Sequence, residues 1–128
     1  MNSKVMDKEQ CYELAQHLSE LSREHLEVNG KPKQYVAIEV GPGPFKNAAR
    51  VWGSHVTFCI RSTELVQRIN LAGFTTKPGR PQAHDCRIFG LSKETVDINR
   101  ALFEEVVRES VEFVHSQKSA NSRSRLRN

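Results

Sequence analysis

The sequence predicts an α+β fold: a small, mostly antiparallel sheet of about three strands with helices packed on one face, in the order α-β-β-α-β-α. Apolar residues recur at helical spacing near both ends of the chain, over residues 7–28 and 93–116. Between these segments, apolar and polar residues alternate in short runs, as they do in half-buried strands. The first two runs are close together in the sequence, which favours antiparallel pairing.

The first helix is expected over residues 7–28. Asp7 is a good N-cap, and Gln10 three residues later completes a capping-box pattern. The residues that share the apolar face are Cys11, Leu14, Ala15, Leu18, Leu21 and His25. Asn29 and Gly30 tolerate the left-handed conformation that ends many helices, so we expect the helix to stop before them.

Three runs of alternating residues predict the strands. The first covers residues 34–40, the second begins at Arg50 or Ser54 and ends at Arg61, and the third covers residues 84–90. Because side chains alternate between the two faces of a strand, the polar set should share the uncovered face of the sheet. That face is expected to hold Tyr35, His55, Thr57, Cys59 and Arg61.

The other elements are marked by capping residues and by Pro and Gly. Ser62 is expected to cap a short helix that ends at Gly73, and residues 74–83 form a loop by their Pro and Gly content. Ser92 is expected to cap the last helix, over residues 93–116. The apolar face of this helix is wider than one stripe, which predicts a central core element or an additional dimer interface.

Charge is distributed unevenly over the 128 residues. Residues 31–93 carry ten Lys and Arg against three Asp and Glu, while the segments on either side are acidic. The net charge of +4 comes from the end of the chain, where four basic residues follow Gln117 without any acid. We therefore expect one globular domain over residues 1–116 and a disordered basic tail over residues 117–128.

Composition also limits the cellular setting. The chain has three widely spaced cysteines, Cys11, Cys59 and Cys86, an odd number that fits a reducing compartment better than a disulfide framework. No apolar run approaches the length of a membrane span, and the N-terminus lacks the apolar core of a secretory signal. The expectation is a small cytoplasmic protein with no membrane partner.

Two loops rich in Gly, Pro and basic residues predict a binding site for an anionic ligand. Glycines allow the backbone to approach a phosphate closely, Lys and Arg neutralise it, and an aromatic ring can stack on a base. We therefore predict a non-catalytic protein that needs no cofactor and binds nucleic acid or a nucleotide. The predicted ligand-binding residues are Lys46, Arg50, Trp52, Arg61, Lys77 and Arg80.

Histidines provide a catalytic alternative. The run His55-Val56-Thr57-Phe58 resembles one half of the signature of two-histidine phosphoesterases, in which two such strands bring an acid and a base to one phosphodiester. The nearest second copy begins at His84. A small phosphoesterase that uses His55 and His84 is therefore one hypothesis. Cys59 and Cys86 are weaker candidates as nucleophiles.

The first alternative to ligand binding, ahead of the phosphoesterase, is a protein-binding inhibitor or adaptor of the kind encoded by phages and mobile elements, acting through its helices. The acidic helices and the basic middle of the chain are complementary in charge, so we also expect a homo-oligomer. No metal site is predicted: His84, Asp85 and Cys86 are consecutive, and consecutive residues of a strand point to opposite faces.

Overall fold

The computed structural model describes residues 5–30, 35–43 and 46–127, with side chains as far as Ser119. In chain order, its elements are α1 (Lys8–Ser19), β1 (Glu27–Gly30), β2 (Tyr35–Glu39), β3 (Asn47–Trp52), β4 (His55–Cys59), α2 (Thr63–Leu71), β5 (Thr75–Pro78), the 3-10 helix η1 (Pro81–Ala83), β6 (Asp85–Phe89), α3 (Lys93–Ile98) and α4 (Arg100–Arg127). The predicted α+β class is confirmed, but the sheet has six strands rather than about three.

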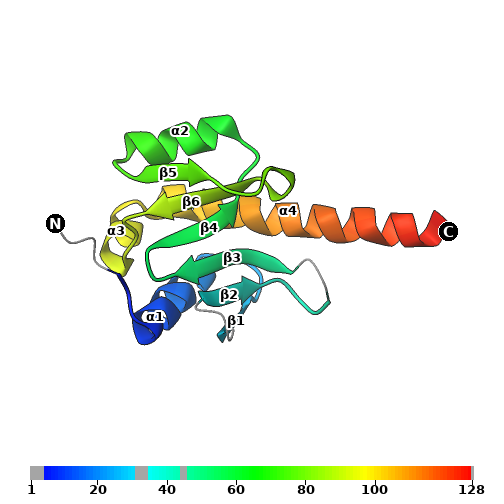
Figure 1. Ribbon diagram of the computed structural model, residues 1–128, viewed down its shortest axis with the longest axis horizontal. Helices are drawn as coiled ribbons and strands as arrows, with labels where there is room; N and C mark the ends of the chain where they lie inside the picture. Colours follow the sequence, from blue (N-terminus) through cyan, green and yellow to red (C-terminus); the bar gives the residue numbers. More distant parts are fainter. Residues whose placement is uncertain (1–4, 31–34, 44–45, 128) are drawn as a thin grey trace.

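The sheet is antiparallel throughout, in the order β1-β2-β3-β4-β6-β5 (Figure 1). Helix α1 contacts β1, β2 and β3, and helix α4 contacts β3 and β4 on the same side. The core between these layers includes Val36, Ile38, Val51, Val56, Phe58, Ile88, Leu14, Leu18, Phe103 and Val106. Among the described residues, no helix lies over the opposite face of the sheet, which we call the open face (Figure 1).

One additional strand replaces the end of the first predicted helix. Helix α1 ends at Ser19 instead of continuing to residue 28, and β1 occupies part of the remaining segment. Val28 lies opposite Ile38 of β2 and packs against the core. Hydrogen bonds to a neighbouring strand and burial of Val28 therefore outweigh the helical pattern of this segment.

The other two additional strands lie in the middle of the chain. The predicted run up to Arg61 is two strands, β3 and β4, because Gly53 and Ser54 connect them in a tight turn. Strand β5 lies within residues 74–83, for which the sequence predicts a loop. It is an edge strand, where Pro78 is tolerated because one side of such a strand makes no ladder hydrogen bonds.

The capping predictions are confirmed. Asp7 and Gln10 form a capping box, and the hydroxyls of Ser62 and Ser92 accept hydrogen bonds at the starts of α2 and α3. The predicted last helix is interrupted, however, at Asn99, which separates α3 from α4. The wide apolar face of α4 is buried against the sheet, so the core accounts for it.

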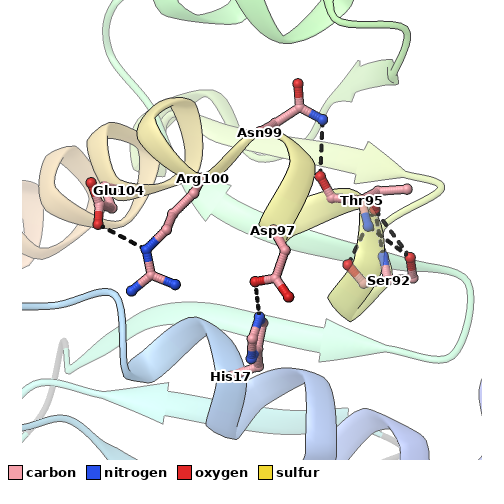
Figure 2. A network of polar contacts seen from close by, with 7 residues as sticks. All are labelled: His17, Ser92, Thr95, Asp97, Asn99, Arg100 and Glu104. Atoms are coloured by element: carbon pink, nitrogen blue, oxygen red, sulfur yellow. Dashed lines mark hydrogen bonds and ion pairs between the residues drawn. The ribbon is translucent and has the colours of Figure 1, made fainter.

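A polar network fixes α3 on α1. Figure 2 shows His17 of α1 pointing at Asp97 of α3, with 2.7 Å between His17 Nε2 and Asp97 Oδ1. In the same view, the side chain of Asn99 donates a hydrogen bond to the carbonyl oxygen of Thr95. These contacts lie in the helical layer and hold the break between α3 and α4 in place.

Helix α4 extends past the sheet (Figure 1). Its backbone is helical through Arg127 and so includes most of residues 117–128, for which the sequence predicts a disordered tail; Asn128 lies outside the described residues. No Gly or Pro occurs between Arg100 and Arg127, so neither of the two strongest helix breakers lies within α4 once its buried part has formed. Within the described part of the chain, no helix has the length and apolar character needed to cross a membrane.

Candidate anion-binding site

Four ring-bearing side chains form a row across one end of the open face. The register of the strands places Tyr35 opposite Trp52 and His55 opposite Phe89. Ring centroids are 4.7 Å apart for Tyr35 and Trp52, 5.9 Å for Trp52 and His55, and 5.1 Å for His55 and Phe89. All four residues are half-buried. We call Tyr35, Trp52, His55 and Phe89 the ring row.

Three cations lie in the next row of the open face. Arg50 is opposite Thr57, Thr57 is opposite Arg87, and Arg87 is opposite Lys77. Thr57 is buried, whereas Arg87 and Lys77 are exposed. Lys77 Nζ lies 5.7 Å from the centroid of the Phe89 ring, which joins this row to the ring row. We call Arg50, Arg87 and Lys77 the cation row.

Among the residues that the structure describes, the two exposed members of the cation row have no acidic partner. Within the described ranges, no carboxylate lies within ion-pair distance of Arg87 or Lys77. Like charges directly opposite each other on paired strands are destabilising. The fold therefore holds two cations together at a cost in stability, on the face that no helix covers.

A cavity of about 720 Å³ lies at the end of the sheet where β3 begins and β4 ends, opposite the end that carries Trp52 and His55. It is lined by Tyr35, Gly43, Lys46, Asn47, Arg50, Cys59, Arg80, Gln82, Ala83, Phe113, Val114 and Gln117. The charged side chains in this lining are Lys46, Arg50 and Arg80, all cations. We call it the basic cavity. Tyr35 also belongs to the ring row, and Arg50 to the cation row, so the cavity and the open face are continuous.

A buried carboxylate holds two of these cations. Asp85 Oδ2 accepts hydrogen bonds from Arg50 Nη2 at 3.1 Å and from Arg80 Nε at 2.8 Å. The Asp85 side chain is only 4% exposed, and the hydrogen bond to it raises the pKa of Arg80 above its ordinary value. A Cβ at Gly79 would lie 2.7 Å from Asp85 Cβ, so glycine is needed there for the hairpin to approach Asp85.

Lys46 is held by a second acid. Its Nζ lies 3.7 Å from Oε1 of Glu39, a buried residue of β2, and the amide of Asn29 donates to the same oxygen at 2.7 Å. About a third of the Lys46 side chain remains exposed, at 34%. The ammonium group is therefore positioned by Glu39 and still reaches the cavity.

Helix α4 forms one wall of the cavity because polar contacts attach it to the strands. The buried hydroxyl of Ser110 accepts a 2.7 Å hydrogen bond from the backbone N–H of Cys59 and donates to the carbonyl oxygen of Ala48 at 2.6 Å. This bridges β3 and β4 beside the irregularity in the β2–β3 register. These contacts place Phe113 and Val114, one turn further along the helix, and Gln117, two turns further, at the cavity.

The structure brings most of the predicted ligand residues together. Lys46, Arg50 and Arg80 share the basic cavity, while Trp52 and Lys77 lie on the open face beside it. Arg61 is the exception. Its guanidinium carbon lies 5.3 Å from the centroid of the Phe113 ring, and Arg61 is not part of the cavity lining.

Three residues that the binding prediction missed complete the arrangement: Tyr35, Arg87 and Phe89. Alternation alone placed Tyr35 on the uncovered face. The positions of Arg87 and Phe89 depend on β6 lying between β4 and β5, which the sequence does not reveal. Nothing local distinguished these two side chains from other surface residues of a strand.

The two histidines of the phosphoesterase hypothesis do not meet. His55 is opposite Phe89, whereas His84 precedes Asp85 at the far end of β6. Four residues along a strand correspond to about 13 Å. The ring of His84 contacts Phe113 of α4, with 5.6 Å between centroids. This arrangement places no second imidazole beside His55 within the ring row.

The cysteines lack the properties of nucleophiles. Burial raises the pKa of Cys59 to about 11, with a smaller contribution from Asp85, and burial raises that of Cys86 to about 11. Both thiols are therefore protonated at neutral pH, and the thiolate is the reactive form.

His55 is also affected by its surroundings. Burial lowers the pKa of His55, and the charges of Arg87 and Arg50 lower it further.

Comparisons with protein families, with curated proteins and with solved structures found no match for this chain. Function is therefore inferred from the geometry of the open face and the basic cavity.

Proposed function

We propose that the protein binds a phosphate-bearing ligand, either a nucleic acid or a nucleotide, in the basic cavity and does not transform it. One observation carries the proposal: Lys46, immediately before β3, and Arg50, within β3, meet Arg80 from the segment after β5, and these three are the charged side chains in the cavity lining. Charge-assisted hydrogen bonds to phosphate are among the strongest that a protein makes.

Arg50 and Arg80 are held by Asp85 in positions from which they can bind an anion. Asp85 accepts from one nitrogen of each guanidinium, and each arginine has five N–H donors, so several donors remain for a ligand. A guanidinium held in place loses less side-chain entropy on binding than a free one. The cavity volume lies in the range of small-molecule binding sites.

The chemistry of the neighbouring side chains supports binding without catalysis. Acid–base catalysis of phosphate transfer needs groups poised to exchange protons at one reacting atom. His55 of β4 lies opposite Phe89 at the end of β6, whereas His84 precedes the start of β6, and burial raises the pKa of the Cys59 thiol, which lines the cavity, to about 11.

A double variant tests the proposal. Lys46→Gln with Arg80→Gln removes two cations of the cavity and leaves Arg50 paired with Asp85. We expect affinity for a mixed-sequence single-stranded oligonucleotide of about 12 nucleotides, or for AMP, to fall about tenfold or more. A charge-assisted hydrogen bond contributes about 1.5–3 kcal/mol, and 1.4 kcal/mol corresponds to a factor of ten.

The matched control is Arg100→Gln with Arg108→Gln, which removes the same charge from the exposed surface of α4. Fluorescence anisotropy for the oligonucleotide and calorimetry for AMP provide the affinities, and circular dichroism checks the fold. The proposal is wrong if neither probe binds the wild-type protein, or if the two double variants bind equally well.

A further inference from the structure

The ring row and the cation row lie outside the basic cavity, and a ligand confined to the cavity leaves most of both rows unused. Trp52, His55 and Phe89 do not line the cavity, and neither do Arg87 and Lys77. Aromatic side chains are large and apolar, and a row of half-buried rings on an uncovered sheet face is a surface suited to contact with other flat, apolar groups.

We infer that the ligand is a single-stranded nucleic acid whose bases contact the ring row and whose phosphates follow the cation row toward the basic cavity. This inference rests on the proposed function, because the cavity provides one end of the path. It extends that function by naming the class of ligand, a strand of several unpaired nucleotides.

The length of the cation row excludes a lone nucleotide as its complete ligand. Arg50, Thr57, Arg87 and Lys77 lie on four successive strands, and neighbouring strands are about 4.8 Å apart. The row therefore spans about 14 Å. A single phosphate group is too small to contact Arg50 and Lys77 together, whereas successive phosphates of one strand reach both.

The positive charges of the cation row indicate that the ligand is negatively charged. Arg87 and Lys77 face each other on paired strands, and the structure shows no carboxylate beside either one within the ranges it describes. A phosphate placed between them removes this repulsion. Binding therefore recovers the free energy that the repulsion costs the unbound protein. An acidic protein surface supplies the same charge but no stack of flat bases for the rings.

The rings favour an unpaired strand over a duplex. In a duplex, the faces of the bases are stacked on each other and only their edges are presented in the grooves, so no base face is available to the ring row. In a single strand, base faces are available to aromatic rings, and each such stack contributes to affinity with little sequence preference. Phe89 is two residues from Arg87 on the same face of β6, so one nucleotide reaches a ring and a cation together.

Trp52 provides a direct readout, since it is the only tryptophan of the chain. The experiment titrates the full-length protein with four probes: a mixed-sequence single-stranded DNA of about 12 nucleotides, the RNA of the same sequence, the corresponding DNA duplex, and AMP. Quenching of Trp52 fluorescence reports contact at the ring row, and anisotropy of labelled strands reports affinity.

We expect DNA or RNA single strands to bind at least about tenfold more tightly than the duplex and AMP, and to quench Trp52. The double variant Lys77→Gln with Arg87→Gln should weaken single-strand binding about tenfold, because it removes two cations that neutralise phosphates, and should leave AMP binding unchanged. Both side chains are exposed, so the variant is expected to fold. The matched control is Lys93→Gln with Arg108→Gln, two exposed cations of α3 and α4.

The outcomes separate this inference from the proposed function. One result would overturn the inference and leave the proposed function standing. In it, AMP and single strands bind with equal affinity, and this affinity falls in the Lys46 and Arg80 variant but not in the Lys77 and Arg87 variant. If the duplex binds as tightly as the single strands, or if Trp52 is not quenched by them, the inference is also wrong. If no probe binds, both proposals fail.

Discussion

Asp85 accepts a hydrogen bond of 3.1 Å from Arg50, a residue 35 positions earlier in the chain and two strands away in the sheet. The same oxygen accepts from Arg80 at 2.8 Å. One buried carboxylate therefore connects β3, β6 and the segment that follows β5, and it sets the positions of two of the three cations in the basic cavity.

Replacing Asp85 should weaken both the fold and the site. In Asp85→Asn the guanidinium of Arg50, which is 19% exposed, loses its carboxylate partner. Removing one member of a buried ion pair typically costs about 3–5 kcal/mol, and the greater exposure of Arg80 places our expectation near 3 kcal/mol. Urea denaturation measures the change. Glu104→Gln, which breaks an exposed pair with Arg100, should cost less than about 1 kcal/mol. Equal effects of the two substitutions would contradict the role of Asp85.

Lys77 should oppose stability in the free protein. Lys77→Thr removes the repulsion with Arg87 across β5 and β6, and threonine suits a strand. We expect the free energy of unfolding to rise by about 0.2–1 kcal/mol at low salt, and less at high salt, where charges are screened. The comparison is Lys93→Thr, an exposed residue on α3. A loss of stability in Lys77→Thr at low salt would show that the two cations do not repel each other.

The environment of His55 predicts a pH dependence. Burial first, and then the charges of Arg87 and Arg50, lower its pKa from 6.5, so the folded state binds a proton less readily than the unfolded state. Stability from this residue is therefore complete above about pH 7 and decreases as the pH falls through 6.5. In urea titrations between pH 7.5 and 5, the stability of the wild type relative to His55→Gln should decrease on acidification. A difference that stays constant over this range contradicts the prediction.

The basic end of the chain should add affinity that depends on salt. Removing residues 120–128 deletes Arg123, Arg125 and Arg127 and keeps Lys118, whose Nζ donates hydrogen bonds to the carbonyl oxygens of Val40 and Pro42. We expect weaker oligonucleotide binding and a slope of log affinity against log salt that is lower by about 0.7 for each phosphate that the shortened chain no longer neutralises. Anisotropy titrations at several salt concentrations measure the slope. If the slope does not change, residues 120–128 do not contact the ligand.

Much of the local structure could be predicted from the sequence. Asp7 and Gln10 predicted the start of α1, and Ser62 and Ser92 predicted the starts of α2 and α3, because a cap depends on residues only three positions apart. Alternation correctly grouped Tyr35, His55, Thr57 and Cys59 on one face. The basic middle of the chain also indicated most of the cations of the candidate site.

Contacts between distant segments decided the rest. Strands β1 and β5 are short, and their own residues do not require an extended conformation; each forms because β2 or β6 offers backbone hydrogen bonds along its edge. The same reason explains the site. The register of β2, β3, β4 and β6 aligned Tyr35, Trp52, His55 and Phe89, and it brought Asp85 to Arg50. Local patterns determined which residues are capped, buried or basic, whereas pairing between remote strands determined which of them meet, because hydrogen bonds of a sheet join segments whose separation in sequence carries no local signal.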